Sequence, residues 1–207
     1  PKMKFVELDC LYGQYQLNSN KRAEGFVSAE KLWMTGKTLP AACDGFFAQW
    51  AAAGQLTEQK RWQRAKLAAQ TRNYSLASTL VDSLNSLAPQ GRLLLAVAQK
   101  PEMVNNPAQF APVDEAMSDV VGLGLRRLAK QDPQKALSML DGYAATMHFS
   151  REEQVEIAKE TGLTLARRYD DRALEVMTKY DPELRDDTVT EWRLRLLLRL
   201  GRWEDAY

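Results

Sequence analysis

Few side chains in this sequence have the type and spacing that catalysis needs. His148 is the only histidine, and neither a carboxylate nor a serine nucleophile can be paired with it from the sequence. Glu152, Glu153 and Glu156 could act as general acids, but they fall in the first turn of an expected helix, where carboxylates complement the helix dipole. The sequence therefore offers no candidate catalytic residue, and His148 is expected to be a surface or loop residue.

The chain has two cysteines, Cys10 and Cys43. Two thiols cannot complete a tetrahedral zinc site, no histidine lies near either of them, and they do not form a Cys-x-x-Cys redox pair. Composition leaves two alternatives open, namely two buried free thiols or one disulfide. We expect no metal site and no cofactor.

Gly122, Gly124 and Arg127 resemble a glycine-rich phosphate loop in their spacing. Such a loop follows a β-strand and opens a helix, whereas these residues lie inside a helical pattern with no strand before them. The spacing therefore predicts close packing between helices rather than a phosphate site.

Arginines recur near the expected C-terminal ends of helices. One interpretation is electrostatic stabilisation of those ends, and the other is a basic stripe that could hold an anionic polymer. With a formal net charge of +1, the chain has no overall field to attract nucleic acid. The arginines are Arg126, Arg127, Arg167, Arg168, Arg193, Arg195, Arg199 and Arg202.

The five tryptophans fall mostly at core positions of the helical pattern. An exposed tryptophan could stack on a sugar ring, but the sequence does not single one out. They are Trp33, Trp50, Trp62, Trp192 and Trp203. No residue is assigned to glycan contact.

Helical spacing of apolar residues runs through the whole chain, and no stretch alternates as a strand does. Leu8, Leu11, Tyr12 and Tyr15, for example, fall at i, i+3, i+4 and i+7 and form one face of a helix. No apolar run approaches the roughly 18 residues that would cross a bilayer. The pattern predicts short helices joined by short loops.

Later helix starts carry capping residues. Asp132 and Asp181 each stand before a proline that suits the first helical position, and Ser150 has capping-box spacing to Glu153. The prolines at 101, 107 and 112 predict a loop-rich passage in the middle of the chain, which is the best candidate for a hinge or a surface loop.

Small residues recur early in the second helix of several pairs, and the last three are spaced by 37 and 33 residues, which is the period of tetratricopeptide-like repeats. They are Ala23, Ala77, Ala136, Ala173 and Ala206. The expected fold is all-α, a right-handed superhelical solenoid of stacked antiparallel hairpins that relates irregularly to tetratricopeptide repeats. Residues 1–207 would be part of one such domain, and we interpret the chain as an excerpt of a longer protein.

One stretch carries a family resemblance. Cys10 is followed by Leu-Tyr-Gly-Gln-Tyr, residues 32–37 read Leu-Trp-Met-Thr-Gly-Lys, residues 40–44 read Pro-Ala-Ala-Cys-Asp, and Phe46, Phe47, Trp50 and Gly54 follow. This stretch, up to Trp62, resembles the N-terminal superhelical domain of the soluble lytic murein transglycosylases of Gram-negative bacteria. It covers about a quarter of the chain.

The resemblance implies a periplasmic enzyme that cleaves the MurNAc–GlcNAc bond of peptidoglycan and leaves a 1,6-anhydro sugar. In that family a ring-forming superhelical domain carries a separate lysozyme-like catalytic domain. The family's catalytic signatures, a Glu-Ser pair, a Gly-Leu-Met-Gln segment and an Ala-Tyr-Asn-Ala-Gly segment, do not occur here. We therefore expect that the catalytic domain is absent from this sequence and that the chain alone is inactive.

The resemblance also implies a disulfide between Cys10 and Cys43, because the family places one at the matching positions. Closing a loop of that size would stabilise the fold by about 3–4 kcal/mol on the chain-entropy model. The bond would tie the first hairpin to the following helix.

Two hypotheses follow. The first is a non-catalytic scaffold segment of a peptidoglycan-cleaving transglycosylase, whose partner is the glycan strand, reached through the parent enzyme in the periplasm. The second is a stand-alone tetratricopeptide-like module for protein–protein interaction, which binds a peptide in its groove. An oxidised cysteine pair favours the first, and two free thiols favour the second.

Overall fold

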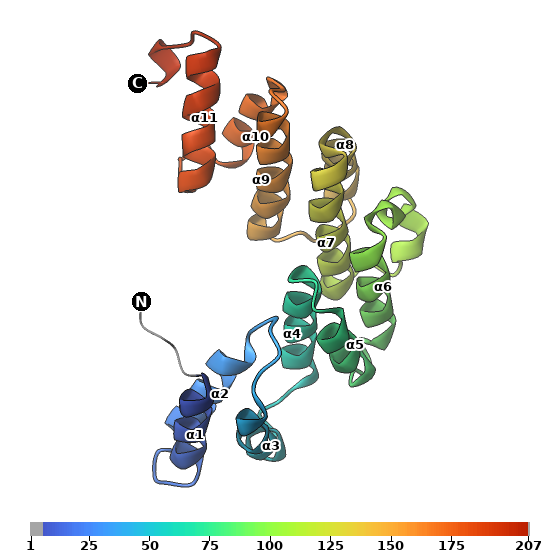
Figure 1. Ribbon diagram of the computed structural model, residues 1–207. Helices are drawn as coiled ribbons and strands as arrows, with labels where there is room; N and C mark the ends of the chain where they lie inside the picture. Colours follow the sequence, from blue (N-terminus) through green and yellow to red (C-terminus); the bar gives the residue numbers. More distant parts are fainter. Residues whose placement is uncertain (1–5, 207) are drawn as a thin grey trace. The chain divides into compact units, whose positions relative to one another are not determined.

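The computed structural model describes residues 6–206, and in that part of the chain the regular structure is entirely helical, with no strand (Figure 1). The α-helices are α1 (Val6–Leu17), α2 (Arg22–Trp33), α3 (Asp44–Ala52), α4 (Glu58–Gln70), α5 (Tyr74–Asp82), α6 (Ala88–Gln99), α7 (Glu115–Gln131), α8 (Pro133–Ala144), α9 (Arg151–Arg167), α10 (Arg172–Tyr180) and α11 (Asp187–Arg199). Short 3₁₀ turns add η1 (Ala41–Cys43), η2 (Pro101–Asn105), η3 (Pro107–Phe110) and η4 (Glu204–Ala206). The prediction of an all-α chain is confirmed.

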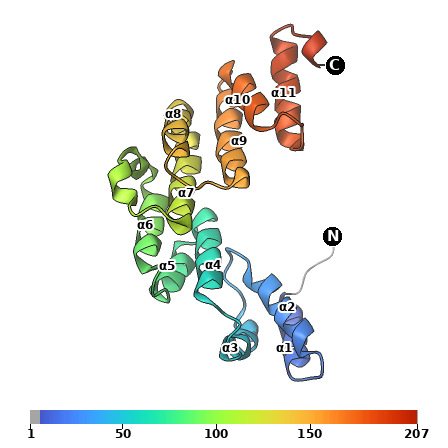
Figure 2. The ribbon, with the colours of Figure 1, turned by 180° about the vertical axis from the view of Figure 1, so that it is seen from behind.

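The chain divides into two compact units, residues 1–95 and 96–207. In the first unit α1 packs on α2 and α3, and α4 packs on α5 (Figure 2). Its core is rich in aromatic side chains, and Phe46, Trp50 and Trp62 are completely buried. Helical hairpins around an apolar core therefore build this unit.

In the second unit α7 packs on α8, α9 and the turn η2, and α9 packs on α8, α10 and α11. α7 is buried around most of its circumference, and α9 is buried on all sides only in its second half, from Thr161 to Ala166. The passage with the three prolines forms the turns η2 and η3, and it buries Val104 and Phe110. The Tyr143 hydroxyl donates to the carbonyl of Val104 at 2.7 Å, so this passage is part of the core rather than a surface loop.

The capping residues fixed two of the three predicted helix starts. Asp132 and Ser150 accept hydrogen bonds from the N–H groups of Lys135 and Glu153 at 3.0 and 3.1 Å, and α8 and α9 begin directly after them. The predicted start at Asp181 is wrong. Its buried carboxylate accepts from the N–H groups at 185 and 186 and closes a turn, and α11 begins only at Asp187.

The face of α1 formed by Leu8, Leu11, Tyr12 and Tyr15 is exposed. The opposite face carries the small residues Cys10 and Gly13, and it lies against the neighbouring helices. A side chain at Gly13 would collide with the ring of Phe46 in α3, so this close approach requires glycine. Small residues rather than large ones therefore determine which face of α1 is buried.

Among residues 6–206, no helix combines the length and the apolar character that crossing a membrane requires.

Candidate functional site

The side chains considered for catalysis do not meet in a catalytic arrangement. His148 is exposed, and its backbone N–H, not its imidazole, contacts the Ser118 hydroxyl at 3.0 Å. That hydroxyl donates to the carbonyl of Asp114 at 3.0 Å. Hydrogen bonds from its own backbone N–H and from the Ser150 hydroxyl lower the pKa of Glu152, whereas a general acid needs a raised pKa. Within the described part of the chain, no group of three histidines, cysteines or carboxylates is placed to hold a metal.

The two glycines of α7 serve close packing. A Cβ at Gly122 would collide with the carboxylate of Glu153, which pairs with Arg126 at 3.2 Å. A Cβ at Gly124 would collide with Val104 and lie 2.6 Å from a Val97 methyl group. The helix–helix interpretation of these glycines is therefore confirmed.

Most arginines of the series near helix ends are engaged within the chain. Arg168 donates to the carbonyls of Lys130 and Gln131 at the end of α7, at 3.4 and 2.9 Å. Arg199 donates to the carbonyl of Tyr169 after α9 at 3.1 Å, and it also pairs with Asp171.

Further arginines follow the same pattern. Arg127 donates to the carbonyl of Ala98 in the last turn of α6, and Arg193 donates to that of Asp181 at 2.8 Å. The structure favours helix-end capping over a free basic stripe.

Three of the five tryptophans, Trp33, Trp50 and Trp62, are buried. Trp192 is partly buried beneath the guanidinium of Arg195, 5.1 Å from its ring centroid. Trp203 is 65 % exposed and is the one tryptophan whose face could meet a ligand among the described residues.

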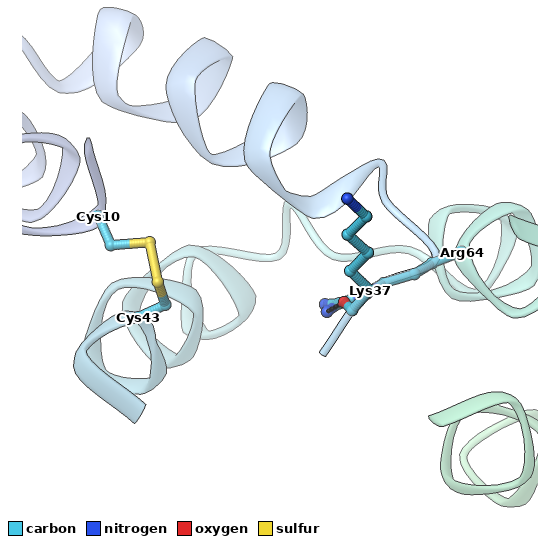
Figure 3. The surroundings of a disulfide bond; sticks show 4 residues. All are labelled: Cys10, Lys37, Cys43 and Arg64. Carbon is cyan, nitrogen blue, oxygen red and sulfur yellow. Dashed lines mark hydrogen bonds between the residues drawn. A yellow bond between two sulfur atoms is a disulfide. The ribbon is translucent and has the colours of Figure 1, made fainter. Parts of the chain in front are cut away.

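The cysteine pair is joined as a disulfide (Figure 3). Cys10 in α1 and Cys43 at the end of η1 have Cα atoms 5.0 Å apart and are 33 residues apart in the sequence. Both are completely buried. The bond joins α1 to the start of α3, the helix whose Phe46 packs against Gly13 of α1.

The segment from Trp33 to Asp44, which carries the family resemblance, is held by α4 and by the start of α5. The carbonyl of Gly36 accepts from the Thr71 hydroxyl at 3.1 Å and from the Asn73 amide at 3.2 Å. The same amide donates to the Thr38 hydroxyl at 3.1 Å, while the Asn73 side-chain oxygen caps α5. A Cβ at Gly36 would collide with the backbone of Leu67. These contacts of residues 33–44 with α4 and α5 hold two hairpins of the first unit together, and we call them the lock.

A buried cation completes this lock. The Arg64 guanidinium lies 4.1 Å from the ring centroid of Trp33 and 6.0 Å from that of Phe47. It donates to the carbonyl of Lys37 at 3.4 Å, and Figure 3 shows these two residues side by side. Arg64 is only 5 % exposed, and this burial lowers its pKa to about 10. The indole N–H of Trp33 donates to the carbonyl of Lys60 at 3.2 Å, so one aromatic ring joins α2 to α4 on both its face and its edge.

This arrangement suits a structural role. Most of its hydrogen bonds go to backbone carbonyls, although the buried Nε of Arg64 has no hydrogen-bond partner. Its aromatic rings pack edge to face, with the ring centroids of Trp33 and Phe47 5.2 Å apart. Sequence reasoning missed Arg64 and Asn73. A signal existed for Arg64, because it shares the buried face of α4 with Ala65 and Ala68, where a charged residue is unusual.

Comparison with known proteins identifies relatives of this chain. The lytic transglycosylase Slt of Pseudomonas aeruginosa, solved as an inactive mutant, matches the whole chain at 59 % identity with a TM-score of 0.95, and the match covers 34 % of that structure's chain. The 70-kDa soluble lytic transglycosylase of Escherichia coli matches the whole chain at 20 % identity with a TM-score of 0.59, over 39 % of its own chain, which supports the fold alone.

Curated relatives agree with this match. The soluble lytic murein transglycosylases of Escherichia coli K12 and Salmonella typhimurium are 24 % and 22 % identical over 153 and 149 residues, or 73 % and 72 % of the chain. The chain spans about a quarter of the length of these relatives, 24 % and 23 % respectively.

A family model described as Cucumovirus coat protein also matches, over residues 8–93. It covers less than half of the chain, whereas the Pseudomonas aeruginosa match includes the same residues and extends over all the others. The chain is homologous, over part of their length, to the soluble lytic transglycosylases.

Proposed function

We propose that the chain is a non-catalytic scaffold segment of a longer lytic murein transglycosylase. The observation that carries this proposal is the 59 % identity along the whole chain to one third of the Pseudomonas aeruginosa protein. The helical hairpins of each unit support the finer proposal that residues 1–207 form part of a right-handed, ring-forming solenoid. The lysozyme-like catalytic domain would lie outside this sequence.

In this proposal the complete polypeptide works in the periplasm and cleaves the MurNAc–GlcNAc bond of peptidoglycan, leaving 1,6-anhydro ends. The buried disulfide supports an oxidising compartment. It also weighs against a stand-alone cytosolic adaptor, whose thiols would be kept reduced. The segment's own contribution is a helical scaffold that positions the catalytic domain on the glycan strand, and the disulfide and the lock that contains Trp33 and Arg64 stabilise its first unit.

The test compares the complete polypeptide, the 207-residue chain alone and the complete polypeptide without this segment. Purified murein sacculi are incubated with each protein, and released 1,6-anhydro-muropeptides are quantified by liquid chromatography and mass spectrometry. We expect release by the complete polypeptide and none by the chain alone. Anhydro products from the 207-residue chain, or none from the complete polypeptide, would contradict the proposal.

A further inference from the structure

A groove lies between the start of α9 and the passage that joins α10 to α11. One wall is the first part of α9, from Arg151 to Glu156, and the other wall is formed by residues 180–186. The volume of the groove is about 410 Å³, within the range of roughly 300–1,000 Å³ that is typical of sites for small ligands. Both walls belong to the second unit. We call this space the α9 groove.

The floor of the α9 groove is apolar. Val155 and Tyr180 are partly buried, and they also border a small apolar space next to the buried side chains of Val176 and Met177. They therefore separate the groove from the core. A ligand with an aliphatic chain would bury apolar surface against them, which favours binding.

Two carboxylates stand on the α9 wall. Glu152 and Glu156 are exposed and one helical turn apart, so their side chains are neighbours on the helix surface. Among residues 6–206, neither carboxylate forms an ion pair with a basic side chain, and Lys159 pairs with Asp186 instead. Two adjacent carboxylates without a cation create a negative field at this position, and an ammonium group of a ligand would relieve it.

A guanidinium group reaches across the groove beside these carboxylates. Arg151 donates to the carbonyl of Tyr180 on the opposite wall at 3.5 Å, which is longer than the roughly 2.7–3.2 Å of a normal hydrogen bond. Arg185 on that wall is already paired with Glu183. Arg151 has no ion-pair partner in the described part of the chain, and a carboxylate would be a stronger acceptor for it than this distant carbonyl.

We propose that the α9 groove binds the end of a short peptide that carries both a free ammonium and a free carboxylate. Glu152 and Glu156 receive the ammonium, Arg151 receives the carboxylate, and the carbon chain between them covers Val155 and Tyr180. A purely anionic ligand would be repelled by the two carboxylates, and a purely cationic ligand would leave Arg151 without a partner.

This inference deepens the proposed function and rests on it for the source of the peptide, because peptidoglycan consists of glycan strands that carry short peptides. The groove would hold such a peptide at a place on the scaffold that lies outside the catalytic domain.

The test measures the affinity of the peptide N-acetyl-Ala-Ala-Lys, whose last residue presents both groups, by isothermal titration calorimetry. Two analogues each remove one charge, one by acetylating the lysine ammonium and the other by amidating the C-terminal carboxylate. We expect each analogue to bind about fivefold more weakly than the parent peptide, the upper part of the range for an exposed ion pair. Equal affinity for all three peptides, or no binding of the parent, would overturn the proposal.

Substitutions then assign each charge to its partner. Arg151→Gln should weaken the parent peptide about fivefold and leave the affinity of the amidated analogue unchanged. Glu156→Gln should weaken the parent to a similar extent and leave the affinity of the acetylated analogue unchanged. Circular dichroism checks that both variants are folded. A variant that weakens all three peptides equally, or none of them, would count against the assignment.

Matched controls change the same residue types at exposed positions outside the groove. Arg167→Gln at the other end of α9 and Glu175→Gln on α10 should leave all three affinities unchanged.

The same titrations are made with the 207-residue chain and with the complete polypeptide. We expect the same affinities in both, since all the residues of the groove lie in this chain. Binding by the chain alone would overturn the proposal, because another part of the polypeptide would then fill the groove. Release of anhydro-muropeptides without peptide binding would refute the α9 groove alone, and peptide binding without that release would refute the proposed function alone.

Discussion

Replacing Gly36 by alanine should disrupt the lock between α2 and α4. The new Cβ would collide with the Leu67 backbone and lie 2.5 Å from the Thr71 hydroxyl, and a backbone neighbour cannot rotate away. If the segment moves instead, the Gly36 carbonyl loses its hydrogen bonds from Thr71 and Asn73, and Arg64 loses its bond to the adjacent carbonyl. Loss of two to three hydrogen bonds at about 1 kcal/mol each, together with about 1 kcal/mol of strain, should lower the free energy of unfolding by about 3–4 kcal/mol.

Urea unfolding followed by tryptophan fluorescence measures this loss, because Trp33, Trp50 and Trp62 all lie in the first unit. Gly142→Ala, in the second unit, is the control for a glycine with free space around it, and its unfolding is followed by circular dichroism because the three buried tryptophans lie in the first unit. A Cβ there meets nothing within 4 Å, so alanine in α8 should raise the stability by about 0.5–1 kcal/mol. A Gly36→Ala protein within about 1 kcal/mol of the original, with an unchanged slope, would refute the lock, since the segment would then shift at little cost.

Three further predictions concern other parts of the chain. Reducing Cys10–Cys43 should lower the free energy of unfolding by about 3–4 kcal/mol, and an unchanged urea midpoint with reductant would contradict this. Burial raises the pKa of Tyr143 to about 12, above the value near 10 in the unfolded chain, so its contribution to stability is complete below pH 10 and is lost as the pH rises towards 12. Urea midpoints across that range should fall, and a Tyr143→Phe chain should show a shallower fall. Arg168→Gln should lower the free energy of unfolding by about 1 kcal/mol, because two carbonyls at the end of α7 lose a charged donor. Arg167→Gln, at the exposed neighbour, should leave the free energy of unfolding almost unchanged, and equal losses in the two variants would count against the cap.

The sequence predicted what depends on local chemistry. Helical periodicity identified the all-α fold, and Asp132 and Ser150 marked the starts of α8 and α9 because a cap acts within one turn. The predicted helix start at Asp181 was wrong because a carboxylate can accept backbone hydrogen bonds in a tight turn as well as at the start of a helix, and the sequence alone does not distinguish the two.

What depends on contacts between distant residues could not be predicted from one sequence. The exposed apolar face of α1 shows this, because large apolar residues are normally assigned to the core, yet α1 buries Cys10 and Gly13 so that α3 can approach closely. Likewise, the hydrogen bonds from Thr71 and Asn73 to Gly36 connect residues 35 and 37 positions apart. The cysteine pairing was available only from the family resemblance, since composition left it open.

The arginine bonds to helix ends have a practical consequence for rearranging the chain. Arg127, Arg168 and Arg199 satisfy carbonyls that stand 29, 37 and 30 residues earlier. The carbonyls at these helix ends therefore receive a hydrogen bond from an arginine that follows about one hairpin later in the sequence. A deletion, a duplication or a swap between relatives that separates the two partners would leave the carbonyl without its donor and the guanidinium without its acceptor. Hairpins should accordingly be exchanged together with the arginine that follows them, so the useful unit of exchange is offset from the hairpin itself.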